Sequence, residues 1–379
     1  MKRRHLLATL AVVAGLGLSG CNKQESTDQA AAGQGAAKQQ TFQWKMVTTW
    51  PKNFPGLGTA PERFAENVAE MSDGRLKIKV YGAGEMVPAL EVFDAVSQGT
   101  AEMGHGAGYY WKGKVPAAQF FSTVPFGLTA QEYNGWMFHG GGLKLYREAY
   151  KPFGVIPWPG GNTGVQMGGW FAKEINSLED LQGLKMRIPG IGGDVLEMAG
   201  GTPENLPGGE IFTALETGRI DATEWVGPYN DRAFGFYKID KAKYYYYPGW
   251  HEPGTALELI VNEEAYKALP KDLQAIVDVA AREMNADLLA EYTARNNEAL
   301  RALVEDEGVQ LRRFPDDVIN KLRDMSKKAV ANLAEKDDMA RKAYESYKSF
   351  RDKVVPYTAI SEKAYLDIRT EGSAAPNAE

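Results

Sequence analysis

Residues 212–221 read FTALETGRID: an apolar helix end, a glycine suited to a left-handed helix cap, and the acidic start of a strand. Residues 93–102 read FDAVSQGTAE and follow the same pattern earlier in the chain. One copy in each of two lobes is the economical explanation. The alternative is that two helix ends of this kind resemble each other by chance.

The segments around both copies alternate between strand and helix patterns. Alternation of apolar and polar residues indicates strands, whereas apolar residues three and four apart indicate helices. Strands separated by helices imply parallel sheets with crossover helices, so the expected fold class is α/β. In the first half we expect strands at 42–50, 76–81 and 101–106 and helices at 60–71 and 89–97. In the second half we expect strands at 165–171 and 184–188 and helices that begin at Ser177 and at Ile211.

The chain is expected to cross between the two lobes twice. A strand at 256–261 fits the first lobe, so the segments near 160–163 and 248–254 become hinges that allow closure around a ligand. A helix over 270–307 follows, with a proline in its first turn and a glycine just after its end. This helix is long enough to run behind both lobes as a spine.

These expectations give a domain organisation for the folded part of the chain. Its length is too great for one core and suits two lobes. We expect lobe one with the spine helix at 42–160 plus 249–310, lobe two at 161–248, C-terminal helices at 311–370 and a flexible tail at 371–379.

Residues 1–20 are typical of a signal peptide. A basic stretch precedes an apolar run at 6–18 that is too short to span a bilayer. The run leads into LSGC at 18–21, which resembles the lipobox of bacterial lipoproteins, so Cys21 is expected to be acylated. Residues 21–41 would then form a lipidated flexible tether, because they contain almost no residue able to build a core. An ordinary cleavage site that happens to precede a cysteine is the alternative.

Composition excludes several classes of function. Cys21 is the only cysteine among 379 residues, which excludes an intrachain disulfide and a cysteine-based metal site. The formal net charge is −6, and loss of the signal peptide would remove basic residues only. An acidic chain argues against nucleic acid as a partner. An anionic ligand would therefore need a locally placed positive charge.

Signatures of enzymes are absent from the sequence. It contains no phosphate-binding loop, no GxSxG motif and no pair of histidines at helical spacing. After the signal peptide, the histidines are His105, His139 and His251, which lie in three separate segments. Packing in the core or exposure on the surface accounts for each of them. We therefore do not expect an enzyme.

Two segments carry polar residues that suit an anionic ligand. Residues 160–170 read GGNTGVQMGGW, in which Asn162 and Gln166 offer amide groups at the first hinge. Arg187 ends the strand LKMR just before a Pro-Gly pair. Ligands of open α/β sheets bind beyond the carboxyl ends of strands, where an arginine can hold a carboxylate through two N–H groups. A surface arginine near a turn is the alternative.

Two acids accompany these groups. Residues 221–228 read DATEWVGP and bring Glu224 and Trp225 to a strand end, and Glu252 follows Trp250 and His251 at the second hinge. Two carboxylates beside an arginine would repel an anion, and a bound cation would remove that conflict, because hard cations take carboxylate, amide and carbonyl oxygens. Aromatic side chains are expected to wall the cleft, namely Tyr109, Tyr110 and Phe126, although aromatic core packing is the alternative.

The run from Phe42 to about Thr370 resembles the solute-binding proteins of tripartite ATP-independent periplasmic (TRAP) transporters. The stretches that carry the resemblance are LQGLKMR at 181–187, ALETGRIDA at 214–222 and the long helix from Pro270. The resemblance implies a two-lobe periplasmic-binding-protein-like fold with hinge strands and a spine helix. It also implies that Arg187 grips the ligand carboxylate and that the membrane permease subunits are partners. Some relatives pair through C-terminal helices, so a homodimer is possible.

Within this family the chain is similar to the branch that binds 2-oxo or 2-hydroxy monocarboxylates with a metal ion. The similar stretches are GNTGVQMGGWF at 161–171, ATEWVGP at 222–228 and residues 244–252. The resemblance implies Na⁺ or Ca²⁺ held by Gln166, Glu224, the Trp225 carbonyl and Glu252, with no organic cofactor. His251 stands where this branch often has a tryptophan, which would change the volume of the cleft.

The expected function is therefore capture of a small acid such as pyruvate or lactate and its delivery to a permease. The expected location is periplasmic or extracytoplasmic, with a lipid anchor in the membrane. Two alternatives stay open at this point. One is a metal-dependent enzyme that acts on a 2-oxo acid with Glu224 as its base. The other is a lipoprotein for binding or adhesion that makes no use of the cleft.

Overall fold

The computed structural model describes residues 40–371. The expected signal peptide, the lipidation site Cys21, nearly all of the tether and nearly all of the flexible tail lie outside the described residues. Within residues 40–371, none of the helices has the combination of length and apolar character needed to cross a membrane.

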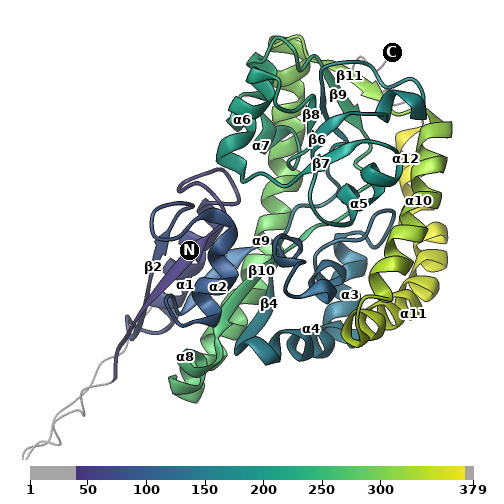
Figure 1. The fold of residues 1–379 in the computed structure, drawn as a ribbon. Helices are drawn as coiled ribbons and strands as arrows, with labels where there is room; N and C mark the ends of the chain where they lie inside the picture. Colours follow the sequence, from purple (N-terminus) through teal and green to yellow (C-terminus); the bar gives the residue numbers. More distant parts are fainter. Residues whose placement is uncertain (1–39, 372–379) are drawn as a thin grey trace, which may run out of the picture. The chain divides into compact units, whose positions relative to one another are not determined.

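The first lobe is built on a five-stranded sheet in the order β2-β1-β3-β10-β4 (Figure 1). Its strands are β1 (Phe42–Thr48), β2 (Leu76–Tyr81), β3 (Met103–Gly106), β4 (Val155–Asn162) and β10 (Ala256–Asn262). β1 pairs in parallel with β2 and β3, whereas β10 lies antiparallel between β3 and β4. β10 thus lies in this sheet although it follows most strands of the other sheet in the sequence. The helices of this lobe are α1 (Thr59–Met71), α2 (Val92–Ser97), α3 (Ala130–His139), α4 (Gly142–Tyr150) and α8 (Glu263–Ala268).

The second lobe is built on a six-stranded sheet in the order β11-β9-β5-β8-β6-β7. Its strands are β5 (Gly169–Phe171), β6 (Lys185–Arg187), β7 (Thr202–Glu204), β8 (Ala222–Thr223), β9 (Tyr244–Tyr247) and β11 (Gln310–Arg313). Its helices are α5 (Gly190–Met198), α6 (Gly208–Thr217) and α7 (Pro228–Phe234). The two sheets with their helices confirm the expected α/β two-lobe fold class.

The repeated helix–glycine–strand pattern occurs once in each lobe. Gly99 follows α2 with φ +73° and leads to β3 of the first sheet. Gly218 caps α6 with φ +79° and leads to β8 of the second sheet. Glycine adopts this left-handed conformation without the steric cost that a Cβ atom would add. The two stretches therefore play the same structural part in the two lobes.

A long helix, α9 (Lys271–Arg301), continues into a π-helical turn at Ala302–Asp306. It packs on β4 and α1 of the first lobe and on α7 of the second (Figure 1). Its buried face includes Leu273, Val277 and Leu288. Burial of each such side chain stabilises the fold by roughly 1.5–3 kcal/mol. A single helix thus ties both lobes together, as the expected spine.

The strand β11 was not expected from the sequence, which assigned helices to 311–370. β11 pairs in parallel with β9, so the chain returns to the second lobe after α9 and crosses a third time. The strand is only four residues long, with Leu311 buried between polar neighbours. So short an alternation carries little periodic signal, and its pairing with β9 is a tertiary effect.

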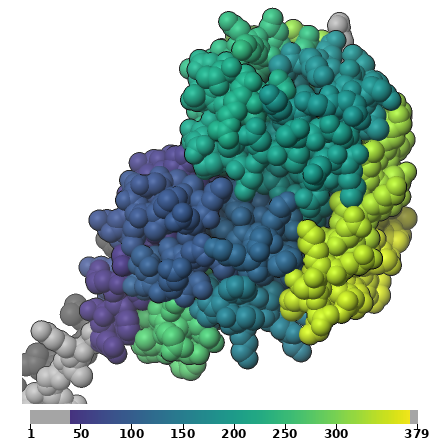
Figure 2. Space-filling view, in the orientation of Figure 1, coloured from purple at the N-terminus to yellow at the C-terminus, as the bar shows by residue number. Residues whose placement is uncertain are grey.

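Three helices end the described chain: α10 (Asp316–Ala334), α11 (Asp338–Ile360) and α12 (Glu362–Thr370). α10 packs on α5 of the second lobe, and α11 packs on α3 and α4 of the first. Figure 2 shows these helices, in yellow-green, against blue and teal parts of the surface that belong to both lobes. The C-terminal helices therefore brace the two lobes on one side.

Candidate functional site

Two connections between the lobes run side by side and form the floor of the candidate site. Residues 163–168 join β4 to β5, and residues 248–255 join β9 to β10. Backbone hydrogen bonds link them from Thr163 N to Thr255 O (3.0 Å), from Gln166 N to Glu252 O (3.1 Å) and from Gly249 N to Gln166 O (3.0 Å). These bonds hold the side chains of Gln166 and Glu252 next to each other at the hinge.

Arg187 ends β6 and is 1 % exposed. Its Nε donates to the Leu206 carbonyl at 3.2 Å, and its Nη1 donates to the Glu224 carbonyl at 3.2 Å and to the Glu224 carboxylate. Its Nη2 donates to the Tyr110 hydroxyl of the first lobe at 3.0 Å, and its guanidinium lies 4.9 Å from the centre of the Trp225 ring. Burial is the largest single influence on the pKa of Arg187 and lowers it, but Glu224, with smaller contributions from Tyr110, Tyr109 and Glu252, outweighs burial in sum, so the pKa is raised. Arg187 is therefore a permanently charged link between the lobes.

These contacts occupy most of the N–H groups of Arg187. In this conformation Arg187 cannot bind a ligand carboxylate through two N–H groups as expected, because Glu224 accepts both hydrogens of Nη1. A bound acid would have to use the remaining hydrogen of Nη2 or displace Tyr110. The arginine is thus fixed by protein groups of both lobes, with one hydrogen of Nη2 left over.

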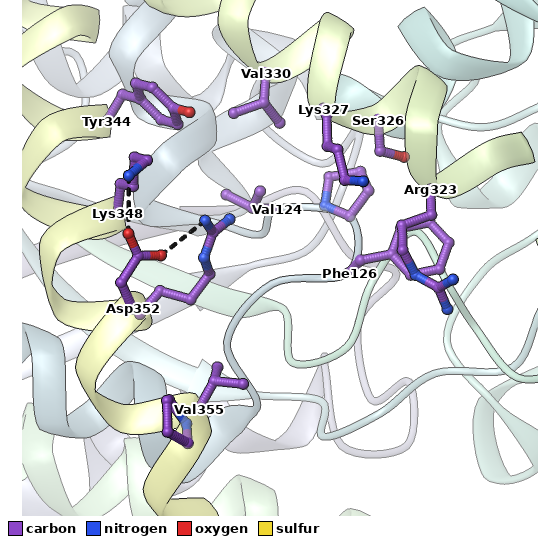
Figure 3. Close-up of a pocket in the computed structure, with 13 residues that line it drawn as sticks. Val124, Phe126, Arg323, Ser326, Lys327, Val330, Tyr344, Lys348, Asp352 and Val355 are labelled. Atoms are coloured by element: carbon purple, nitrogen blue, oxygen red, sulfur yellow. Dashed lines mark hydrogen bonds and ion pairs between the residues drawn. The ribbon is translucent and has the colours of Figure 1, made fainter. Parts of the chain in front are cut away.

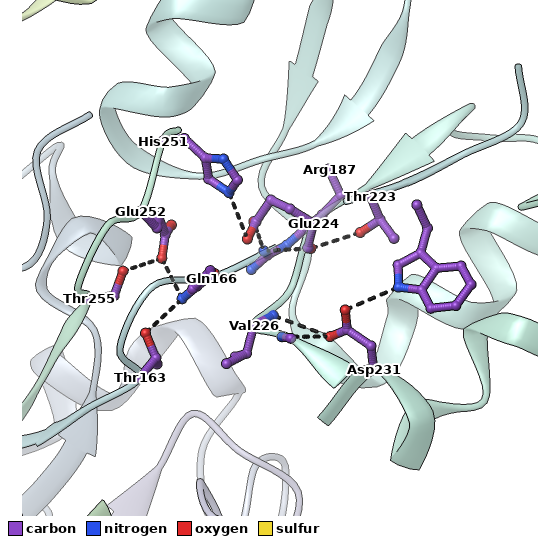
Figure 4. A network of polar contacts seen from close by, with 12 residues as sticks. Thr163, Gln166, Arg187, Thr223, Glu224, Val226, Asp231, His251, Glu252 and Thr255 are labelled. Carbon is purple, nitrogen blue, oxygen red and sulfur yellow. Dashed lines mark hydrogen bonds and ion pairs between the residues drawn. The ribbon is translucent and has the colours of Figure 1, made fainter. Parts of the chain in front are cut away.

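Gln166, Glu224 and Glu252 form a buried polar cluster around this arginine (Figure 4). The Gln166 amide nitrogen donates to Thr163 Oγ1 at 3.1 Å and to Glu252 Oε2 at 2.8 Å, and Thr255 also donates to Glu252. Among residues 40–371, however, Gln166 Oε1 and Glu224 Oε2 have no hydrogen-bond partner. Buried acceptors of this kind are rare in folded proteins and point to a missing partner.

The charges of the cluster identify the kind of partner that fits. Glu224 and Glu252 face a single guanidinium, and burial, followed by the charge of Glu224, raises the pKa of Glu252 well above its usual range. A cation would both neutralise the excess negative charge and take the free amide and carboxylate oxygens, which are the ligands that Na⁺ and Ca²⁺ prefer. The residues present therefore fit a hard cation.

His251 lies in the same cluster, within the second connection. It is 1 % exposed, and its Nε2 lies 3.5 Å from Glu224 Oε2, beyond the usual range of a hydrogen bond. Figure 4 shows its ring turned toward the Glu224 carboxylate. Glu224, His251 and Glu252 each offer one ligand atom, and these atoms all lie within 4.8 Å of one another.

Aromatic side chains close the cluster toward the first lobe. Tyr109 and Tyr110 contact each other edge to face at 4.8 Å between ring centres, and burial raises the pKa of Tyr110 to about 12. The cavity between the lobes has a volume of about 10 Å³, which is room for about one water molecule. A small acid therefore has to enter while the lobes are apart. The cavity is lined by Trp50, Leu57, Tyr109, Tyr110, Thr163, Gln166, Trp225, Val226, Thr255 and Leu257.

The structure places two candidate residues away from this cavity. Asn162 is buried, but its Nδ2 donates to the Gly254 carbonyl at 3.3 Å and its Oδ1 accepts from Gly164 N at 2.8 Å. Both ends of the amide thus tie the hinge together. Phe126 stacks on Trp250 at 5.9 Å between ring centres and lines a groove at the surface. Its neighbours along the chain gave no sign of this packing.

That groove is larger than the central cavity, with a volume of about 710 Å³ (Figure 3). It lies between α10, α11 and the segment around Phe126. Arg323 covers the Phe126 ring at 4.9 Å, and Asp352 pairs with Lys348 and Arg351. The groove contains neither the buried acceptors nor the buried arginine of the central cluster, so the smaller central cavity is the better candidate site.

Sequence reasoning missed Trp50 and Thr255. Trp50 lies just after β1, lines the cavity, and donates from Nε1 to His105 Nδ1 at 2.8 Å. Since ligands bind beyond the carboxyl ends of strands, the position of Trp50 at the end of the expected strand 42–50 was the signal that could have found it. Thr255, by contrast, is recognisable only from its contact with Glu252.

Comparison with known proteins gives a consistent result. The model of the family described as bacterial extracellular solute-binding protein, family 7 (DctP), matches residues 46–337, more than half of the chain. The monocarboxylate 2-oxoacid-binding periplasmic protein of Nostoc sp. is 44 % identical over 366 residues, which cover 96 % of this chain and 98 % of that protein.

Two solved structures are also close relatives. A TRAP periplasmic solute-binding protein from Pseudoalteromonas atlantica, with bound sodium and pyruvate, is 47 % identical with a TM-score of 0.84. Its counterpart from Colwellia psychrerythraea, with bound calcium and pyruvate, is 46 % identical with a TM-score of 0.84. Each comparison covers 86 % of this chain and 99 % of the other.

Proposed function

The chain belongs to bacterial extracellular solute-binding protein family 7, the DctP family of TRAP solute-binding proteins. From this premise we propose that it binds a small 2-oxo monocarboxylate such as pyruvate together with a cation. The observation that carries the proposal is the buried cluster of Arg187, Gln166, Glu224 and Glu252 at the junction of the lobes, with two acceptors that lack partners within residues 40–371. Pyruvate with sodium or calcium in two relatives supports the same ligand class.

In this proposal Gln166, Glu224, the Trp225 carbonyl and Glu252 hold the cation. When bound, the cation supplies the positive charge that lets an acid approach two carboxylates and offers a contact to the oxo oxygen. Arg187 pairs with the carboxylate of the acid, and Tyr110 keeps the guanidinium oriented from the opposite lobe. Tyr109 and Trp225 cover the methyl end of the acid and exclude water.

Closure of the lobes completes the site. Gly190, just beyond Arg187, lies against Tyr109 of the first lobe, and a Cβ at this glycine would come within 3.1 Å of the Tyr109 Cβ. A glycine therefore permits the close approach that shields the bound acid. Separation of the lobes at the permease would release the acid, because Arg187 would lose Tyr110 and the hinge segments would part from Trp225.

The proposal extends to the setting of the protein. Acylation of Cys21 would hold the protein at a membrane outside the cytoplasm, near the permease that receives the acid. A 2-hydroxy acid such as lactate offers the same carboxylate and an oxygen at the same position, so it is a second candidate ligand. The family is one of transport proteins, and catalysis has no part in the proposed function.

A homodimer is also part of the proposal. α12 is exposed along its length and presents Tyr365, Leu366 and Ile368 at 58 %, 42 % and 69 % exposure. Contiguous exposed apolar residues on a helix are typical of an interaction surface. Light scattering on the full chain and on a variant with charged residues at these three positions would test this part of the proposal.

The central test is calorimetric titration with pyruvate, lactate and a longer 2-oxo acid in buffers that contain Na⁺, Ca²⁺ or neither. We expect pyruvate to bind only with a cation, and saturation at about 100 times Kd to stabilise the protein by about 2.7 kcal/mol. Arg187→Ala should lose at least about 30-fold in affinity, since truncation of one partner of a buried charge pair costs about 2–5 kcal/mol. Absence of binding by any of these acids under all three conditions would reject the proposal.

A further inference from the structure

His251 is a buried polar side chain that the proposed cation site does not use. It is 1 % exposed, and neither of its ring nitrogens has a hydrogen-bond partner among residues 40–371. A buried donor or acceptor without a partner costs about 1–3 kcal/mol. Its aromatic contact with Trp250, at 5.3 Å between ring centres, fixes the ring without satisfying either nitrogen. The fold therefore keeps an imidazole available at this point.

The imidazole is aimed at an acceptor that also lacks a partner among residues 40–371. His251 Nε2 lies 3.5 Å from Glu224 Oε2, and ligand atoms of Glu224, His251 and Glu252 fall within 4.8 Å of one another. Two ligands at about 2.1 Å from a common ion, separated by the tetrahedral angle, lie about 3.4 Å apart. The spacing of the nitrogen and the oxygen is thus longer than a good hydrogen bond and suits two ligands of one ion.

We propose that His251 is a ligand of the cation, so that the site of this chain accepts an imidazole-binding divalent ion such as Zn²⁺, Co²⁺ or Mn²⁺ as well as Na⁺ and Ca²⁺. The inference rests on the proposed function and adds a ligand to it. Amide and carboxylate oxygens suit hard cations, whereas an imidazole nitrogen favours first-row transition metals and zinc. A neutral nitrogen ligand also leaves the charge of the site unchanged, so the acid meets the same balance of Arg187, Glu224 and Glu252.

The test compares cations on the wild-type chain, on His251→Gln and on His139→Gln, with pyruvate present throughout. Glutamine keeps polarity and offers an oxygen in place of the nitrogen. His139 is exposed on α3, so its substitution controls for metal bound by surface histidines. We expect His251→Gln to lose roughly tenfold or more in affinity for Co²⁺ and Zn²⁺, and to change affinity for Ca²⁺ by less than about threefold.

Direct ligation is read from electron spin-echo modulation by ¹⁴N in the complex with Mn²⁺ and pyruvate. The modulation should be present in the wild type and in His139→Gln and absent in His251→Gln. If His251→Gln does not fold, His251→Asn takes its place, with a thermal melt as the check of folding. Equal loss of affinity for all cations, or no ¹⁴N modulation in the wild-type complex, would overturn the inference and place the ring against the acid or Glu224 instead.

The two levels of the proposal fail in different ways. If the wild type binds no acid with any cation, the proposed function fails. If the wild type binds pyruvate with Na⁺ or Ca²⁺ while His251→Gln leaves the preference between hard and transition-metal ions unchanged, only the role of His251 fails.

Discussion

Two buried carboxylates of the second lobe, Asp231 and Glu224, lie in the same network but differ in their surroundings (Figure 4). Asp231 accepts from Trp170 Nε1 at 3.0 Å, from the Tyr245 hydroxyl at 2.7 Å, and from the backbone N–H groups of Val226 and Gly227 at 3.3 and 3.2 Å. Glu224 accepts from Arg187 with one oxygen only, and the other has no partner among the described residues.

The difference separates an acid whose acceptors are all used by the fold from the acid that we propose binds the cation. The donors around Asp231 fix the loop that follows Glu224 and leave that carboxylate nothing to offer a ligand. Glu224 retains one carboxylate oxygen without a hydrogen bond in a buried site. Such an oxygen destabilises the fold unless a ligand or cation contacts it. Burial alone does not distinguish the two residues as candidates for the binding site, since each is 1 % exposed.

The largest effect that would sharpen this comparison is expected from Glu224→Gln. Loss of the charge should lower the affinity for pyruvate with its cation by about 100-fold or more, because the cation loses a charged ligand and Arg187 loses its partner. Calorimetry gives the affinity, and chemical denaturation without ligand gives the stability. A variant that unfolds more easily yet binds pyruvate as well as the wild type would break the distinction.

The reverse result is expected from Asp231→Asn. An amide nitrogen would face donors that now meet a carboxylate oxygen, so the free energy of unfolding should fall by about 1–3 kcal/mol. The affinity for pyruvate should change by less than about threefold, measured below the melting temperature of the variant. A loss of affinity as great as that of Glu224→Gln would show that Asp231 belongs to the binding site.

A smaller effect, on the pH dependence of stability, is expected from Glu258 in β10, a buried carboxylate outside the network. Its Oε2 accepts from Tyr146 and Tyr150, whereas Oε1 has no partner within residues 40–371, and burial raises its pKa to about 7. Because the unfolded chain releases this proton near pH 4.5, the folded state binds more protons between about pH 4.5 and 7, and stability falls as the pH rises through this window.

The slope from this one group should not exceed about 1.4 kcal/mol per pH unit, and it should vanish above pH 7. Glu258→Gln should therefore remove it. Denaturation of both proteins at several values between pH 5 and 7.5 measures the difference. Parallel curves for the two proteins would mean that Glu258 takes up no proton on folding.

Much of the fold could be predicted from the sequence because its elements have clear periodic patterns. The long buried face of α9 and the helix–glycine–strand units can be recognised from short stretches of sequence. The order of strands and helices implies two lobes. β11 could not be found in this way, since four residues with one buried side chain acquire a strand conformation only beside β9. Pairing between distant segments is the part of the fold that local patterns do not contain.

For the site, the sequence indicated residue types at strand ends, and the resemblance supplied the grouping of Gln166, Glu224, Trp225 and Glu252 around a cation. The binding roles of these residues stay predictions. Phe126 and Asn162 show the limit of the approach: an aromatic ring or an amide near a glycine can serve a cleft or a hinge equally well. Their partners, Trp250 and Gly254, are fixed only by the tertiary structure.

The position of β10 between β3 and β4 has a consequence for biosynthesis. As the chain leaves the ribosome, β4 has no neighbouring strand until Asn262 has been made, and β9 lacks its outer partner until Arg313 has followed. Neither lobe corresponds to one uninterrupted stretch of translation product. A gene fragment that encodes residues 42–162 alone would therefore yield a sheet without β10 between β3 and β4, and one that encodes residues 163–248 would lack the edge strand β11.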